Sequence, residues 1–193
     1  MTTLSRFQAA GFPVGGDALG VDLADTLVTV TEPATDLLRD AGQCAAWWSL
    51  QSDRLPRDAV APSLKATIGL RDAVRAVLDA AQQGRQLPKA AVRTLNETAA
   101  MAPTSPELHV ASGEAQICSR WHADDPAALA LAATAASVVS LIGSPDVARL
   151  RRCANPACSM LFVAGDARRR FCTQNICANR VRVARHYHRQ HPR

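Results

Sequence analysis

The sequence predicts an α+β protein in which a helix-rich first part with one short antiparallel hairpin precedes a small C-terminal module organised by four cysteines. Three observations carry this prediction. Apolar residues recur at helical spacing through most of residues 1–148. The stretch ELHVASGEAQICSRWHAD instead places two runs rich in strand-forming residues around Ser112-Gly113, which is typical of a hairpin. Four cysteines then follow in the pattern C-x4-C-x13-C-x4-C.

Capping and turn residues delimit three of the expected helices. The stretch SLKATIGLRDAVRAVLDAAQQG should begin after Ser63, a good N-cap, and end near Gly84. The next helix, in LPKAAVRTLNETAAM, has Pro88 in its first turn. Asp124-Asp125-Pro126 opens an alanine-rich helix that runs to Ile142.

Two earlier stretches are also expected to be helical. DALGVDLADTLVTV has apolar residues at both helical and alternating spacing, and we expect a helix; ATDLLRDAGQCAAWWSLQ predicts one helix, or two interrupted at Gly42. The tryptophans and the cysteines of the first part are expected in its core: Trp47, Trp48, Trp121, Cys44 and Cys118. The alternative for the tryptophans is the wall of a small-molecule pocket.

The charge of the chain is divided unevenly. Residues 151–193 hold ten arginines against the single acid Asp166, a net charge of +9, whereas residues 1–150 have a net charge of −4. With a boundary near residue 148, this predicts a first domain over residues 1–148 and a basic module over residues 149–193. So basic a segment indicates contact with nucleic acid. A solvated surface, or a docking site for the acidic first domain, is the alternative.

The four cysteines of the basic module predict a zinc site. Two spaced pairs, Cys153 with Cys158 and Cys172 with Cys177, can close a tetrahedral cage of thiolates around Zn²⁺. No apolar run approaches the length of a membrane span, and the N-terminus lacks the features of a secretory signal, so we expect a cytoplasmic protein with reduced thiols. Two disulfides, an iron–sulfur cluster or ligation by the C-terminal histidines are the alternatives: His186, His188 and His191.

The cysteine pattern also predicts how the module folds. In SMLFVAGDARRRF, the MLFV and RRF segments could pair as a hairpin around AGDA, and a helix could begin at Cys177, giving a treble-clef-like zinc finger. One side of that helix is basic, and its apolar side is expected to pack on the cysteine knuckle. The residues expected to contact nucleic acid are Arg168, Arg169, Arg170, Arg180, Arg182, Arg185, Arg189 and Arg193.

The segments LRRCANPACSMLF and RRRFCTQNICANRVRVARHYHR resemble the zinc finger of the CGNR family, bacterial proteins regarded as stress-related transcription regulators. The resemblance implies that the four cysteines bind zinc and that Asn179 and Arg180 end the family motif. Ala178 stands where that motif has glycine, and Phe171 where tryptophan is expected. In this family the finger follows an α/β domain called ABATE, and ALGVDLADTL resembles the start of that domain.

A DNA-binding transcription regulator is therefore the expected function, with a small-molecule effector bound by the first domain and a homodimer as the economical assembly. RNA or ribosome binding is the alternative, because arginine also binds RNA phosphates. An enzyme is the third reading: His109 and His122 could pair with Asp22 or Asp25. We find no nucleophile elbow, phosphate loop or dinucleotide fingerprint, and expect no catalytic residues.

Overall fold

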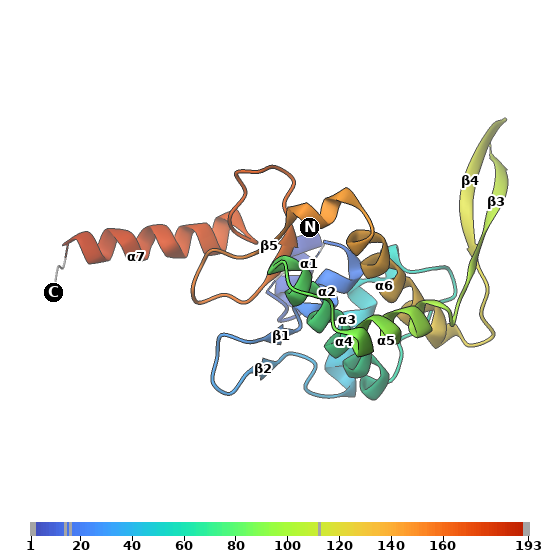
Figure 1. Ribbon diagram of the computed structural model, residues 1–193, viewed down its shortest axis with the longest axis horizontal. Coiled ribbons are helices and arrows are strands. Elements are labelled where there is room, and N and C mark those ends of the chain that lie inside the picture. The colour runs from blue at the N-terminus through green and yellow to red at the C-terminus, as the bar shows by residue number, and fades with distance from the viewer. Residues whose placement is uncertain (1–2, 14, 16, 112, 191–193) are drawn as a thin grey trace.

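The computed structural model of the protein describes residues 3–13, 15, 17–111 and 113–190. Helices form a central body, from which a long two-stranded hairpin leaves at one end and a single helix at the other (Figure 1). The helices of the body are α1 (Thr3–Ala9), α2 (Leu19–Ala24), α3 (Ala41–Leu50), α4 (Leu64–Gln82), α5 (Lys89–Ala99) and α6 (Pro126–Ile142).

Three antiparallel two-stranded sheets accompany the helices in the described part of the chain. Their strands are β1 (Leu27–Val28) with β2 (Thr35–Asp36), β3 (Thr104–Ala111) with β4 (Glu114–Trp121), and β5 (Leu150–Arg152) with β6 (Leu161–Val163). A π-helical turn (Gln174–Ala178) leads into α7 (Asn179–Gln190). The α+β prediction is confirmed. In the part of the chain that the structure describes, none of the helices is both long and apolar enough to cross a membrane.

Side-chain caps start the helices where the sequence predicts them. Ser63 accepts a hydrogen bond from the backbone N–H of Ala66, and Asp125 accepts one from that of Ala127. Asp40 caps α3 in the same way, so the helix begins at Ala41 and has no interruption at Gly42. The expected helical structure over residues 34–40 is wrong, since Thr35–Asp36 is a strand.

The helix expected over DALGVDLADTLVTV is correct only as far as Ala24. There the chain turns, and Leu27–Val28 pairs with Thr35–Asp36 as a short ribbon. The guanidinium group of Arg75, on α4, donates hydrogen bonds to the carbonyl oxygens of Ala24 and Leu27. These carbonyls are thus satisfied without a continuing helix, by a partner that local sequence cannot reveal.

The main core lies between α2, α3, α4 and α6. Trp47 and Trp48 are almost completely buried, and their rings meet edge to face at 4.8 Å between centroids. Helices α2 and α6 approach closely at Gly20, where a Cβ atom would lie 2.0 Å from Cγ2 of Val138. Cys44 is buried as expected.

The prediction that Cys118 belongs to the core is wrong. Cys118 lies on β4, and the β3–β4 hairpin stands away from the body (Figure 1). Cys118 and most other side chains of β4 face solvent. Trp121, at the base of the hairpin, is partly buried and packs against the small apolar cluster around Ala102 and Leu129.

The pairing inside the cysteine module also differs from the prediction. Strand β6 (Leu161–Val163) pairs with β5, which precedes the first cysteine, instead of with residues 169–171. On its other edge, the backbone N–H of Leu161 donates to Asp25 and that of Val163 to Asp17. These two carboxylates occupy the donors that a further strand would need.

Candidate zinc finger and basic helix

The four predicted ligands converge at one point. The Sγ atoms of Cys153, Cys158, Cys172 and Cys177 all lie within 4.8 Å of one another. The Cys158–Cys172 and Cys172–Cys177 separations are 3.8 and 3.6 Å. A tetrahedron with Zn–S bonds of about 2.3 Å has edges of about 3.8 Å. The donor set and its spacing therefore fit Zn²⁺, and these four cysteines form the zinc site.

Short local turns hold each cysteine pair in place. The backbone N–H of Cys153 bonds to the Met160 carbonyl, closing the β5–β6 turn, while the side chain of Asn155 accepts from Ala157 N–H inside it. Thr173 caps the π-helical turn by accepting from the N–H of Cys177. The second pair is thereby fixed at the start of α7.

The close approach of the thiols favours a bound cation. Hydrogen bonds from Cys158 and Cys172 lower the pKa of Cys153 to about 2. The hydrogen bond between Cys158 and Cys153 raises the pKa of Cys158 to about 12. The hydrogen bond of Cys172 to Cys153 likewise raises the pKa of Cys172. One thiolate thus opposes ionisation of its neighbours. A divalent ion removes this conflict, because it balances the thiolate charges.

The predicted arginines of the finger fall into two groups. Arg169 turns inward: it donates to the Cys172 carbonyl at 2.7 Å and lies over the ring of Phe162 at 4.5 Å. Its guanidinium group therefore stabilises the finger. The second group is exposed to solvent and consists of Arg168, Arg170, Arg180, Arg182 and Arg189. The side chain of Arg185 and all of Arg193 lie outside the described residues.

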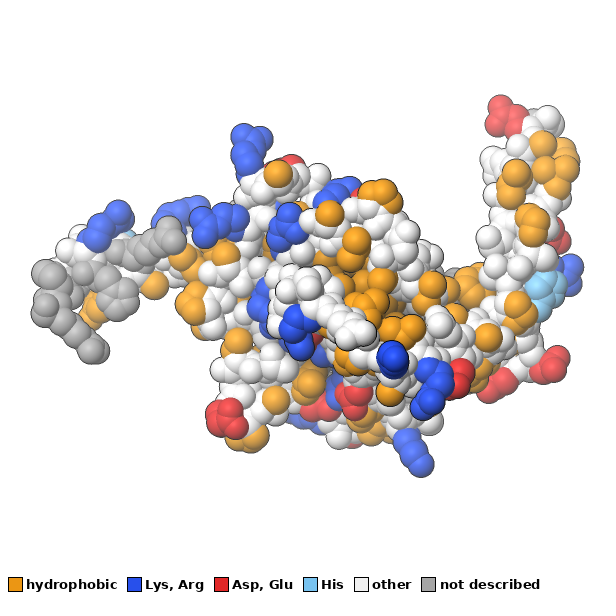
Figure 2. Space-filling view, in the orientation of Figure 1, with side chains coloured by type: hydrophobic (Ala, Val, Ile, Leu, Met, Phe, Trp, Pro, Cys, Tyr) orange, Lys and Arg blue, Asp and Glu red, His pale blue; other side chains and the backbone are white. Residues whose placement is uncertain are grey.

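Helix α7 extends beyond the finger as an arm, and basic side chains gather along it and over the finger (Figures 1 and 2). The expectation that its apolar side packs on the cysteine knuckle is wrong for most of the helix, because Val183 and Tyr187 are both 59% exposed. The reason is size. The buried cluster of the finger contains six residues, too few to cover the 12 residues of α7, which extend about 18 Å.

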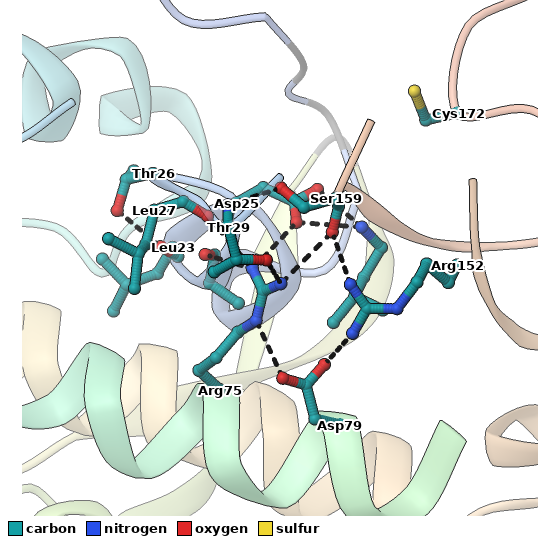
Figure 3. Close-up of polar contacts among 12 residues, drawn as sticks. Leu23, Asp25, Thr26, Leu27, Thr29, Arg75, Asp79, Arg152, Ser159 and Cys172 are labelled. Carbon is teal, nitrogen blue, oxygen red and sulfur yellow. Dashed lines mark hydrogen bonds and ion pairs between the residues drawn. The ribbon is translucent and has the colours of Figure 1, made fainter. Parts of the chain in front are cut away.

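A partly buried polar network joins the finger to the first domain (Figure 3). Arg75 donates to the Ser159 carbonyl at 3.2 Å and to Asp79 at 3.1 Å. Arg152, from the finger, donates to the same carbonyl and reaches the other carboxylate oxygen of Asp79 at 2.6 Å. Asp79 thus bridges two arginines across the boundary.

The finger also contributes to the main core. Leu150 and Leu161, on β5 and β6, are 2% and 1% exposed and pack in the same apolar cluster as α2, α4 and α6. Sequence reasoning missed this connection. The available signal was Arg75, on the apolar side of α4, since a buried arginine needs partners.

Asp25 is the buried acid of this interface, and burial raises its pKa well above the ordinary value, against the opposing Leu161 N–H and Arg75. The folded state then holds a proton that the unfolded state releases above about pH 4, so that stability falls with rising pH up to the folded pKa.

This fall in the free energy of unfolding is at most about 1.4 kcal/mol per pH unit. We expect Asp25→Asn to remove it, because an amide does not titrate, while its oxygen can still accept the hydrogen bond from Leu161. Denaturant unfolding of both proteins across pH checks this. The variant should be the more stable protein at neutral pH; lower stability there would show that ionised Asp25 is needed as a partner of Arg75.

The residues considered for catalysis do not form one site. Asp22 bonds to Arg54 at 2.6 Å, and Asp25 accepts from Leu161. On the hairpin, His109 lies beside Glu107, and His122 is 2.7 Å from the hydroxyl of Ser105. Neither histidine is brought to either aspartate, so the pairing considered for the enzyme alternative does not form.

Family models match both parts of the chain. Residues 17–145 match ABATE, described as "Putative stress-induced transcription regulator", and residues 149–190 match the CGNR zinc finger. Both families are of regulator and zinc finger types. No curated protein matches the sequence. The ABATE match covers most of the chain and the finger model matches the four-cysteine site, so the protein belongs to the ABATE family and carries a CGNR zinc finger at residues 149–190.

Proposed function

We propose that this protein is a cytoplasmic, DNA-binding transcription regulator without catalytic activity, in which residues 1–148 sense a signal and residues 149–193 contact DNA. The carrying observation is α7, a zinc-anchored basic helix that extends clear of the body (Figure 2). A helix about 10–12 Å across fits the major groove of B-DNA. Its exposed arginines would bind phosphates, as would Arg168 and Arg170 on the preceding loop.

Two copies would bind together in this proposal. One finger with a short helix contacts too few base pairs for high specificity, and a dimer on two half-sites meets that need. Because α7 would lie on DNA, the two copies would contact each other through their first domains.

A small-molecule effector has a candidate cavity at the domain boundary. About 310 Å³ of partly open space lies between Pro13 and Val28 of the first domain and Met160, Ile176 and Arg180 of the finger. The zinc ligands Cys158, Cys172 and Cys177 also line it. Bound zinc would fill the part beside the thiolates, and the rest of the lining is mainly apolar with one cation, Arg180, which suits a small apolar anion. A ligand there would touch both parts at once, so its binding could change the placement of α7.

The test is direct binding of the zinc-loaded full chain to labelled duplex DNA and to structured RNA at matched length and salt. We expect tighter binding to the duplex, followed by enrichment of particular sequences when genomic fragments are selected. Tighter binding to RNA would favour the alternative, in which the same helix binds RNA or the ribosome. Failure to bind either polymer at low salt would reject the nucleic-acid function.

A further inference from the structure

The polar face of the β3–β4 hairpin brings together three metal-binding side chains that lie outside the finger. Glu107 is directly opposite Cys118 in the strand register, and His109 follows two residues later, so all three share one face. A carboxylate oxygen, an imidazole nitrogen and the thiol sulfur lie within 4.8 Å of one another. The Nε2 atom of His109 is 3.3 Å from Oε2 of Glu107.

We propose that Glu107, His109 and Cys118 form a second transition-metal site, which takes a borderline divalent ion such as Zn²⁺. A thiolate and an imidazole select such ions, whereas Ca²⁺ and Mg²⁺ require mainly oxygen ligands. Tetrahedral bonds of about 2.0–2.3 Å need ligand atoms about 3.3–3.8 Å apart. The atoms must therefore approach by about 1.5 Å at most. Side-chain rotation allows this, since Glu107 and His109 are 40% and 61% exposed.

The cysteine is the least expected member of this group. Free cysteine is among the most buried residue types, as Cys44 illustrates, yet Cys118 faces solvent. Its Sγ atom lies 3.6 Å from the carbonyl oxygen of Glu107, across the ladder. Arg120, 3.8 Å from the Glu107 carboxylate, would orient that ligand from the side away from the ion.

The two metal sites would behave differently. The finger closes its ion inside four thiolates, whereas three hairpin ligands leave the fourth coordination position to water or to a donor from another molecule. The ion on the hairpin would therefore exchange with solution and fasten β3 to β4. The hairpin and α7 leave opposite ends of the body, so one ion cannot serve both sites in one chain (Figure 1). The inference does not depend on nucleic-acid binding.

The experiment titrates the full chain, with its finger already loaded with zinc, with Zn²⁺ against a chromophoric chelator and separately with Co²⁺. We expect a second ion per chain and, with Co²⁺, a thiolate charge-transfer band. Cys118→Ser and His109→Ala should each lower the affinity for the second ion at least about tenfold. Loss of an outer-shell partner alone already costs about that much. Cys118→Ser should also abolish the band.

His122→Ala is the matched control, because His122 lies at the base of the same hairpin and bonds to Ser105. It should bind the second ion like the parent. A stoichiometry of one ion, or a second ion unaffected by Cys118→Ser and His109→Ala, would overturn the proposal. So would loss of the second ion in His186→Ala, which would place it on α7.

Discussion

Replacing Cys172 with serine is expected to remove the bound zinc and to unfold the finger. Zinc binding in such modules is worth roughly 10–16 kcal/mol. The finger's own buried cluster cannot replace this energy. Its six buried residues are Cys153, Met160, Phe162, Ala164, Cys172 and Cys177, and the three cysteines among them are themselves zinc ligands. Metal analysis and hydrogen exchange of residues 153–178 measure the loss.

The same substitution should also weaken the first domain, because Leu150 and Leu161 belong to its core and the Leu161 N–H bonds to Asp25. Its helices should remain, at a lower unfolding midpoint. Cys44→Ser is the matched control: Cys44 lies in the main core, 3.4 Å from the Thr67 hydroxyl, and this variant should keep its zinc. Full zinc content and unchanged exchange in Cys172→Ser would contradict the assignment of the ligand.

Replacing Arg75 with methionine is expected to destabilise the whole protein by about 3–5 kcal/mol, because each buried carbonyl that loses its partner costs about 1–3 kcal/mol. Arg75 is 7% exposed, and its loss leaves the Ala24, Leu27 and Ser159 carbonyls without this donor. Part of the loss should depend on the finger, because the Ser159 bond exists only when the finger is docked. Denaturant unfolding gives the total.

A double-mutant cycle of Arg75→Met with Cys172→Ser isolates that part, with an expected coupling of about 0.5–3 kcal/mol. Arg93→Met is the control for losing an arginine, since Arg93 is 74% exposed and paired only weakly with Glu97, so its effect should stay below about 1 kcal/mol. Additive effects of Arg75→Met and Cys172→Ser would show that Arg75 stabilises the first domain alone.

The features predictable from sequence were those written in local patterns. Ser63 and Asp125 mark helix starts because each caps the turn that follows it, and the two strand-forming runs around residues 112–113 are adjacent in the chain. The four zinc ligands were predictable because both pairs bind from short turns.

The features that were missed depend on partners distant in sequence. The acceptors on β6's outer edge are Asp17 and Asp25, more than a hundred residues away, so local pattern favoured a hairpin that does not form. Cys118 is exposed because the hairpin stands away from the body. The residues of the strand do not reveal whether the hairpin packs against the body. The exposure of Val183 and Tyr187 follows from the small size of the finger.

The salt dependence of duplex DNA binding tests the proposed role of α7 most directly. If about four phosphates are neutralised per chain, log affinity should fall against log salt with a slope of roughly −3.6. Replacing Arg182, Arg185 and Arg189 with glutamine should flatten that slope by about 2.7 while zinc stays bound.

The matched control replaces three exposed arginines of the first domain, Arg57, Arg85 and Arg93, with glutamine and lowers the net charge of +5 by the same amount. This variant should keep the slope of the parent. Equal slopes for the parent and the α7 variant, or equal flattening in both variants, would contradict the proposal that α7 contacts the phosphate backbone.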